Sequence, residues 1–258
     1  MPAIKVDTKR VCTAFRLGEK KMRAVILAGG RGTRLKPYTI TLPKPLVPVG
    51  GELPILEIII RQLGKAGVER ITMAVNHMAN LIMAFFGDGS RWNIKIDYSL
   101  EEAALGTIGP LTLIPDLPDD FLVMNGDILS DLDYAELYRS HRQAQNDVTV
   151  AVFKRTVQID FGVLKYDAKF RATEFMEKPS YHFDVSMGVY CLKRRAVDHL
   201  VKGQPYGFDR LMIDGIKNGH KIGVRSFNGF WLDLGRPEDF DIANEKYQQL
   251  KTQLGLPE

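Results

Sequence analysis

Residues 22–48, MRAVILAGGRGTRLKPYTITLPKPLVP, decide the fold of this chain. The apolar run at residues 24–28 lacks polar alternation, which predicts a parallel strand buried on both faces. The run ends in the glycine turn, residues 29–32 (GGRG), where backbone N–H groups can approach a bulky anion without side chains in the way. Arg34 and Lys44 follow on a proline-constrained loop. Strand, turn and cations together predict a phosphate-binding site.

Two common phosphate motifs do not fit this turn. A dinucleotide-binding fingerprint requires G-x-G-x-x-G and an acidic residue about 20 residues further on. Here Leu35 stands where the third glycine would be, which argues against a nicotinamide-dependent dehydrogenase. A P-loop requires G-x-x-x-x-G-K-[ST], and the sequence contains no such string.

The stretch from Leu27 to Val49 resembles, almost letter for letter, the signature LAGGxGTRLxPxTxxxPKPLxPV of the sugar-1-phosphate nucleotidylyltransferases, the nucleotide-sugar pyrophosphorylases. The resemblance implies that the glycine turn wraps a nucleoside triphosphate, that Arg34 holds its phosphates and that Lys44 assists in catalysis. The implied nucleotide-binding residues of this stretch are Leu27, Ala28, Gly29, Gly30, Gly32 and Thr33. The implied reaction is attack of a sugar-1-phosphate oxygen on the α-phosphorus, with release of pyrophosphate. Such a reaction depends on positioning, cations and Mg²⁺ rather than on a covalent nucleophile.

Alternating strand and helix patterns predict an α/β fold with a doubly wound, mostly parallel, Rossmann-like mixed sheet. Up to residue 153, the expected strands after the first cover 70–75, 94–99, 121–124 and 148–153, and the expected helices cover 52–65, 77–86, 106–114 and 132–145. Short strands at 162–166, 172–176 and 185–192 then predict a smaller sub-sheet over the sugar half of the site. The remaining expected elements are helices 194–200, 207–219 and 237–250 and strand 222–227.

Ligands of such sheets bind beyond the carboxyl ends of the strands, where Asp127 follows strand 121–124. A carboxylate there, beside a glycine, is a suitable Mg²⁺ ligand, and the resemblance implies the same role. Residues 229–235 (GFWLDLG) match the family's G-x-W-x-D-x-G, which implies that Asp233 is the second metal ligand. An N-cap or turn aspartate is the alternative for both residues, and it applies more to Asp233, which precedes Gly235 and Pro237.

The sugar-binding residues come from the same resemblance. Residues 177–179 match the family's E-K-P, which implies that Lys178 is catalytic and holds the sugar phosphate while Glu177 hydrogen-bonds sugar hydroxyls. Gly162 resembles a glycine that lets the sugar approach the backbone. Ser186 stands where relatives often have an asparagine that contacts a hydroxyl, and we include it among the sugar-binding residues.

Glu101 bears on the choice of base, because it lies five residues before Gly106, where uridylyl and thymidylyl members of the family have glutamine. A carboxylate only accepts hydrogen bonds, which suits guanine, whose N1–H and N2–H₂ both donate. Residues 105–110 (LGTIGP) also resemble the mannose-1-phosphate guanylyltransferases. We therefore expect GTP as donor and a mannose- or heptose-type sugar-1-phosphate as acceptor. A solvated carboxylate is the alternative for Glu101. For the chain, the alternatives are UTP, dTTP or CTP specificity, or a non-catalytic nucleotide-sugar-binding regulatory protein.

Composition excludes other classes of protein. The 258 residues are 45% hydrophobic and 26% charged, with a net charge of +4, which predicts neither nucleic-acid nor membrane binding. Cys12 and Cys191 lack metal-ligand spacing and are consistent with a reducing cytoplasm. We expect an N-terminal extension over residues 1–21, either disordered or docked on a partner, and a nucleotidyltransferase domain over residues 22–258. We expect no C-terminal β-helix of hexapeptide repeats, and a homodimer remains open.

Overall fold

The computed structural model of the protein describes residues 22–254 and 256. The predicted N-terminal extension, residues 1–21, lies outside the described residues.

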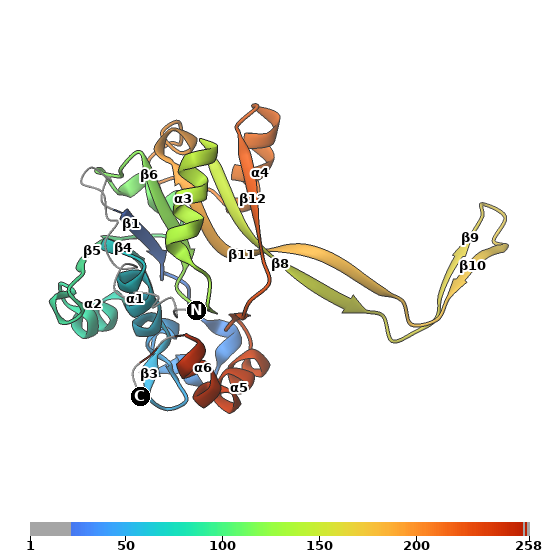
Figure 1. Ribbon diagram of the computed structural model, residues 1–258, viewed down its shortest axis with the longest axis horizontal. Helices are drawn as coiled ribbons and strands as arrows, with labels where there is room; N and C mark the ends of the chain where they lie inside the picture. Colours follow the sequence, from blue (N-terminus) through green and yellow to red (C-terminus); the bar gives the residue numbers. More distant parts are fainter. Residues whose placement is uncertain (1–21, 255, 257–258) are drawn as a thin grey trace, which may run out of the picture.

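A seven-stranded sheet in the order β12-β8-β11-β6-β1-β4-β5 forms the centre of the molecule (Figure 1). Its strands are β1 (Met22–Leu27), β4 (Val68–Val75), β5 (Lys95–Leu100), β6 (Asp120–Asn125), β8 (Val148–Gln158), β11 (Ser180–Lys193) and β12 (Ile222–Phe227). Strand β1 runs parallel to both of its neighbours, β4 and β6, whereas β11 is antiparallel to β6 and β8. The predicted doubly wound, mostly parallel mixed sheet is confirmed.

Helices cover both faces of the sheet, as a parallel arrangement requires. The helices α1 (Ile55–Lys65), α2 (Ala79–Phe86) and α3 (Tyr134–Ala144) pack on one face, and α4 (Phe208–Lys217) with the 3-10 turn η5 (Gly109–Leu113) packs on the other. Along β1, Ala24 and Ile26 contribute to the first core and Val25 to the second. The apolar run therefore forms a strand buried on both faces, as predicted.

Two short strand pairs and two further helices complete the body. The strand β2 (Pro48–Val49) pairs with β3 (Leu53–Pro54), and β7 (Ile128–Ser130) pairs with β13 (Trp231–Asp233). The helix expected at residues 237–250 is divided at Lys246 into α5 (Pro237–Glu245) and α6 (Tyr247–Gln253). The Tyr247 ring packs so closely on Gly50 that a Cβ there would lie 2.0 Å from it, so tertiary packing overrides the helical pattern.

Two other predicted helices are shorter than expected. Residues 106–114 form only the turn η5, and residues 194–200 form only the 3-10 turn Arg194–Ala196. The side chain of Arg195 pairs with Asp147, and the Arg194 backbone N–H donates to Asp119, which ties this turn to neighbouring loops. These tertiary contacts replace the continuing helix that the local sequence pattern suggests.

Residues 154–184 form an arm that projects from the body (Figure 1). Strand β12 pairs with β8 only as far as Phe153, and beyond that residue β8 and β11 pair only with each other. At the end of the arm β9 (Val163–Tyr166) pairs with β10 (Ala172–Met176). This is the predicted small sub-sheet, but it extends away from the body and does not cover the site. Within the described residues, no third strand pairs with this ribbon beyond Phe153, so no backbone hydrogen bonds of the sheet tie it to the body.

Candidate active site

The glycine turn lies beyond the carboxyl end of β1, between β4 and β6. The Ala28 N–H donates to the Ala74 carbonyl at 2.8 Å, and the Gly126 N–H donates to the Leu27 carbonyl at 3.0 Å. These two bonds fix the point where the chain leaves the sheet. Gly30 faces open space, with no atom within 4 Å of the position of a Cβ. The turn therefore presents bare backbone to any ligand at this edge.

The loop after the turn is held by its apolar residues. Three 3-10 turns, Thr33–Leu35, Tyr38–Ile40 and Lys44–Leu46, follow one another, with Leu35 and Leu46 buried beneath them. Gly32 has φ +60°, and its carbonyl accepts a hydrogen bond from the Thr39 hydroxyl at 2.8 Å. The loop exposes Arg34 and leaves the Lys44 side chain only 12% exposed.

Asp127 and Lys44 form an ion pair in which the ammonium donates to Asp127 Oδ2. The other carboxylate oxygen, Asp127 Oδ1, is buried and has no hydrogen-bond partner. A buried carboxylate oxygen without a partner is costly unless a ligand satisfies it. The arrangement therefore offers one unused acceptor at the centre of the site.

Asp233 reaches Asp127 through the β7–β13 pair, although the two residues are far apart in the sequence. In this antiparallel pair Asp233 stands opposite Ile128, the residue after Asp127. The Leu234 N–H also donates to the Asp127 carbonyl at 3.0 Å. Burial and the neighbouring Asp127 carboxylate raise the pKa of Asp233. Two carboxylates that repel each other in this way create a local demand for a cation.

These two aspartates fit Mg²⁺, which is commonly bound by one or two carboxylates and completes its shell with water and substrate phosphates. The unpartnered Asp127 Oδ1 and the raised pKa of Asp233 are the observations that favour an ion there. Among the residues that the structure describes, no cluster of three or more acidic, histidine or cysteine side chains could hold a metal. A substrate would therefore have to supply much of the coordination.

Glu101 lies against the glycine turn. A Cβ on Gly29 would lie 2.9 Å from Glu101 Oε1 and 3.2 Å from Asn76 Cβ. The other oxygen, Glu101 Oε2, accepts the Leu105 N–H at 3.3 Å, and burial raises the pKa of Glu101. Gly106, at φ +76°, begins the turn that follows. Glu101 is thus a partly buried acceptor beside the turn rather than a fully solvated charge.

A cleft of about 550 Å³ opens at this edge of the sheet. It is lined by Arg34, Phe153, Arg155, Trp231, Leu232, Asp233, Gly235, Arg236, Glu238 and Asp239. Ser186 lies near it at the root of the arm, where its hydroxyl is 3.3 Å from that of Tyr190. Burial, together with the charges of Asp127 and Asp233, raises the pKa of Tyr190.

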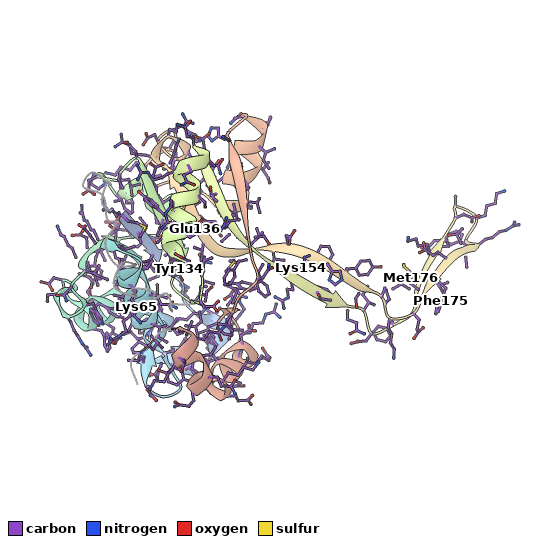
Figure 2. All side chains as sticks on the ribbon, viewed as in Figure 1. Lys65, Tyr134, Glu136, Lys154, Phe175 and Met176 are labelled. Atoms are coloured by element: carbon purple, nitrogen blue, oxygen red, sulfur yellow. The ribbon has the colours of Figure 1, made fainter. Side chains whose placement is uncertain are left out.

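The structure does not bring Gly162, Glu177 or Lys178 to this cleft. Gly162 and Glu177 lie near each other, since a Cβ on Gly162 would be 3.4 Å from Glu177 Oε2. Both belong to the arm, and Figure 2 shows Phe175 and Met176, the residues just before Glu177, far out from the body. Of the predicted sugar-binding residues, only Ser186 lies at the body of the site.

Sequence reasoning did not single out four residues of the site: Asn76, Arg155, Tyr190 and Arg236. The Asn76 side chain donates to the Glu101 carbonyl at 2.8 Å. Asn76 directly follows strand β4, so the rule that ligands bind at carboxyl ends of strands gave a usable signal for it. Arg236 comes directly after the G-x-W-x-D-x-G match. Nothing in the local pattern distinguishes Arg155 or Tyr190.

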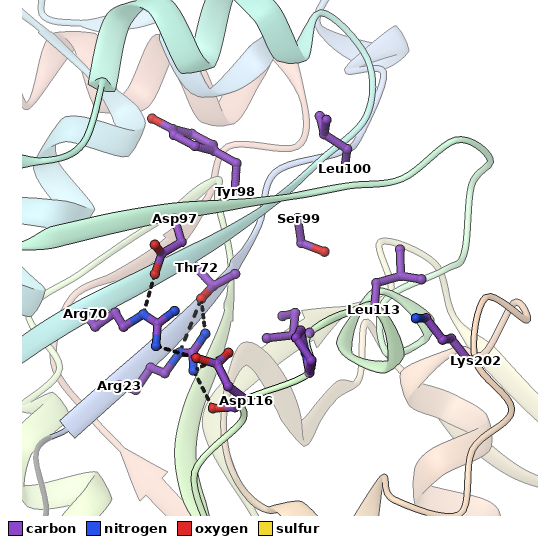
Figure 3. A pocket seen from close by; sticks show the side chains of 12 residues that line it. Arg23, Arg70, Thr72, Asp97, Tyr98, Ser99, Leu100, Leu113, Asp116 and Lys202 are labelled. Carbon is purple, nitrogen blue, oxygen red and sulfur yellow. Dashed lines mark hydrogen bonds and ion pairs between the residues drawn. The ribbon is translucent and has the colours of Figure 1, made fainter.

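A second cavity, of about 500 Å³, borders β1, β4 and β5 (Figure 3). Its two arginines are already paired with carboxylates: Arg23 with Asp116 at 3.0 Å, and Arg70 with both Asp97 and Asp116. The Arg23 guanidinium also donates to the Thr72 hydroxyl at 2.7 Å. Guanidinium groups that are already paired with carboxylates are poor partners for a further phosphate. This second cavity therefore offers less unpaired positive charge than the first cleft.

Across residues 22–254, none of the helices is long and apolar enough to cross a bilayer.

Comparison with known proteins agrees with this geometry. The chain is 32% identical over 223 residues to a mannose-1-phosphate guanylyltransferase of Mycobacterium tuberculosis, covering 84% of this chain and 62% of the relative. It is 33% identical over 226 residues to the mannose-1-phosphate guanylyltransferase catalytic subunit beta of Dictyostelium discoideum, covering 85% and 62%. The chain thus spans less than two thirds of the length of these curated relatives.

Solved structures show the same fold. HddC from Yersinia pseudotuberculosis, in a complex described with GMP-PN, superposes with a TM-score of 0.68 at 26% identity, covering 88% of this chain and 99% of that one. A putative glucose-1-phosphate thymidylyltransferase from Bacillus anthracis superposes with a TM-score of 0.70 at 22% identity, covering 92% and 100%, a likeness of fold alone. Residues 23–250 match the family described as nucleotidyl transferase, and the chain belongs to that family.

Proposed function

We propose that the protein transfers a nucleotidyl group from a nucleoside triphosphate, with GTP favoured, to a mannose- or heptose-type sugar-1-phosphate. The products are an NDP-sugar and pyrophosphate. One observation carries the proposal: the glycine turn, Arg34, Lys44, Asp127 and Asp233 converge at the carboxyl edge of one sheet. The names of the curated relatives support the sugar, and the GMP-PN complex of HddC supports the base.

The reaction joins two anions, so its main obstacle is charge repulsion. The bare backbone of the glycine turn, the exposed Arg34 and the largely buried Lys44 supply positive potential on one side. Asp127 and Asp233 would hold Mg²⁺, which when bound neutralises charge on the phosphates. The ion pair with Asp127 keeps the Lys44 ammonium oriented at this edge, so little reorganisation is needed when the triphosphate enters.

Glu101 is our proposed determinant of the base. It lies beside Gly29, where the start of the turn and Asn76 leave little space. As a carboxylate it accepts from the two donors that guanine presents side by side, N1–H and N2–H₂. Uracil, thymine and cytosine do not present that donor pair. We also propose that Leu27, Ala28, Gly29, Gly30, Gly32, Thr33 and Gly106 contact the nucleotide.

Pyrophosphate release is the direct test. The purified chain is incubated with Mg²⁺, with GTP, UTP, dTTP or CTP, and with a panel of sugar-1-phosphates. We expect release only when both substrates are present, with GTP and a mannose- or heptose-type acceptor fastest. Asp127→Asn is expected to lose activity, and Asp241→Asn on the exposed face of α5 serves as the matched control. Silence across the panel, with NDP-sugar still bound, would contradict the proposal and favour a regulatory binding protein.

We further propose that the enzyme acts in the cytoplasm as a homodimer, with residues 22–258 as the nucleotidyltransferase domain. The family match over residues 23–250 supports this extent of the domain.

A further inference from the structure

Three residues predicted to bind the sugar phosphate, Gly162, Glu177 and Lys178, lie on the arm, out of reach of their own cleft, whereas Ser186 lies at the body. Asp184 pairs with Lys154 at the root of the arm, and Ser180 pairs with Gln158 four residues further out. At about 3.4 Å per residue this places the end of the β8–β11 ladder about 14 Å from the body. Lys178 lies two residues beyond Ser180. No lysine side chain spans that distance, so one copy alone leaves the sugar side of its cleft incomplete.

The arm is built to stay extended. From Ser186 opposite Val152 to Ser180 opposite Gln158, the β8–β11 register is continuous, and its one shift, between Ser186 and Tyr190, lies inside the body. Folding the arm back over its own cleft would break a regular ladder of backbone hydrogen bonds. The irregular point is further out, where Lys178 has φ +44°, an uncommon conformation for a non-glycine residue that recurs at functional sites.

The arm also exposes large apolar side chains. Phe161 is 76% exposed and Phe170 is 83% exposed, and Leu164, Tyr166, Phe175 and Phe183 are exposed as well. Such a concentration on a two-stranded ribbon is uncommon on a monomer and marks a surface that another chain covers. In Figure 2 the outer part of this ribbon, with Phe175 and Met176, stands away from the body.

Resting on the proposed function, we propose that the arm of each copy docks at the cleft of a second copy, so that Glu177 and Lys178 of the partner subunit complete the sugar-phosphate side of the site. The occupant is a second copy because this chain carries both halves: an open cleft of about 550 Å³ and the residues missing from it. The lining of the cleft carries both signs of charge, Asp233, Glu238 and Asp239 beside Arg34, Arg155 and Arg236, so the Lys178 ammonium and the Glu177 carboxylate of a docked arm would both meet opposite charge there. Reciprocal docking gives a closed two-fold dimer.

Mixing two inactive variants tests the proposal. Lys178→Ala damages the arm half of the site and Asp127→Asn damages the body half, and each alone is expected to lower turnover at least ~100-fold. In a mixed dimer, the body with Asp127 receives the arm with Lys178, and one intact site forms. At equal amounts with random pairing, about a quarter of all sites are intact, so co-expression should restore about a quarter of wild-type activity.

The double variant Lys178→Ala/Asp127→Asn mixed with wild type is the control, because it puts both defects on one chain. If each arm served its own cleft, this control mixture would keep half of the wild-type activity and the two single variants would show no recovery. That pattern, in mixtures shown by differently tagged purification to contain mixed dimers, overturns the proposal. A chain that sediments as a monomer at assay concentrations overturns it equally.

Sedimentation gives a readout that does not depend on catalysis, so a failure of the proposed function remains distinguishable. Phe161→Ser on the arm should shift the dimer towards monomer, at least ~10-fold in dissociation constant. Leu81→Ser on α2 is the matched control, since Leu81 is 44% exposed on the body and should leave association unchanged. If the wild type releases no pyrophosphate with any substrate pair, the proposed function fails, while this pair of variants still decides whether the arm forms the interface. If Phe161→Ser and Leu81→Ser both dimerise with the same dissociation constant as the wild type, the docking of the arm is overturned.

Discussion

Replacing Asp127 by Asn and replacing Asp233 by Asn should both abolish turnover, yet change stability in opposite directions. Asp127 neutralises Lys44, whose side chain is only 12% exposed, whereas the ionised form of Asp233 is disfavoured first by burial and then by the repulsion of Asp127. The first substitution leaves a largely buried ammonium without its ion-pair partner. Asp233→Asn removes a carboxylate whose charged form is less favourable in the folded protein than in the unfolded chain. The two aspartates share a proposed role in Mg²⁺ binding, and their different surroundings separate their structural contributions.

The magnitudes follow from these surroundings. Loss of the charged partner of a largely buried lysine costs about 2 kcal/mol. With an unfolding entropy of about 2.1 cal/mol/K per residue over this chain, Asp127→Asn should lower Tm by about 4 °C. Asp233 has a raised pKa, so its ionisation reduces stability as pH rises from the ordinary pKa through the raised one. At pH 7 Asp233→Asn removes that penalty, about 0.5 kcal/mol after solvent screening, and should raise Tm by about 1 °C.

Calorimetry at pH 7, with and without MgCl₂, measures both effects. The wild type should gain Tm from Mg²⁺ and both variants should lose that gain, with Asp241→Asn behaving as wild type. Adding Lys44→Met to Asp127→Asn should recover most of the lost stability, because the unpaired ammonium is then gone. A stable Asp127→Asn protein, or an Asp233→Asn protein that melts several degrees lower, would refute the reasoning about these charges.

Three further outcomes are expected. Gly29→Ala should lower Tm and weaken GTP binding, because its Cβ would lie 3.2 Å from Asn76 Cβ and 2.9 Å from Glu101 Oε1, which would have to move from its place beside the turn. Gly30→Ala should leave Tm unchanged, since nothing lies within 4 Å of its Cβ, and equal Tm values for the two variants would contradict this. Glu101→Gln should reduce the kcat/KM preference for GTP over UTP about 10-fold, and an unchanged preference would remove Glu101 from base recognition. Because burial raises the pKa of Glu101, KM for GTP should rise as pH falls through that raised pKa, and this dependence should disappear in Glu101→Gln.

The sequence predicted best where chemistry restricts the residues of a short segment. The apolar run of β1, the glycine turn, and the place of Asp127 at the end of β6 all follow from local pattern and from the rule that ligands bind at carboxyl strand ends. Asp233 was found through its motif, although its approach to Asp127 depends on the β7–β13 pair, which no periodicity reveals. Tyr190 was missed because its contact with Ser186 arises from the course of β11, which pairs with β6 deep in the sheet.

The largest departure concerns the placement of the arm. Strand patterns at residues 163–166 and 172–176 are correct, but pattern does not specify whether a ribbon folds over its own body or extends away from it. That choice depends on a few long-range contacts, and here the regular β8–β11 ladder holds the ribbon out. A motif match therefore predicts that Glu177 and Lys178 belong to a sugar-phosphate site, but it does not predict which copy of the chain they serve.

A site divided between two copies separates nucleotide binding from sugar transfer. The glycine turn, Arg34 and Glu101 belong to the body, so nucleotide binding needs only one copy. Lys178 arrives on the arm of the partner subunit, so recognition of the sugar phosphate depends on the dimer. The exposed aromatic side chains of the arm, unfavourable in a free monomer, then favour association by the same burial that brings the lysine into place. Assembly and acceptor specificity thus depend on one structural element, the ribbon from residue 154 to residue 184.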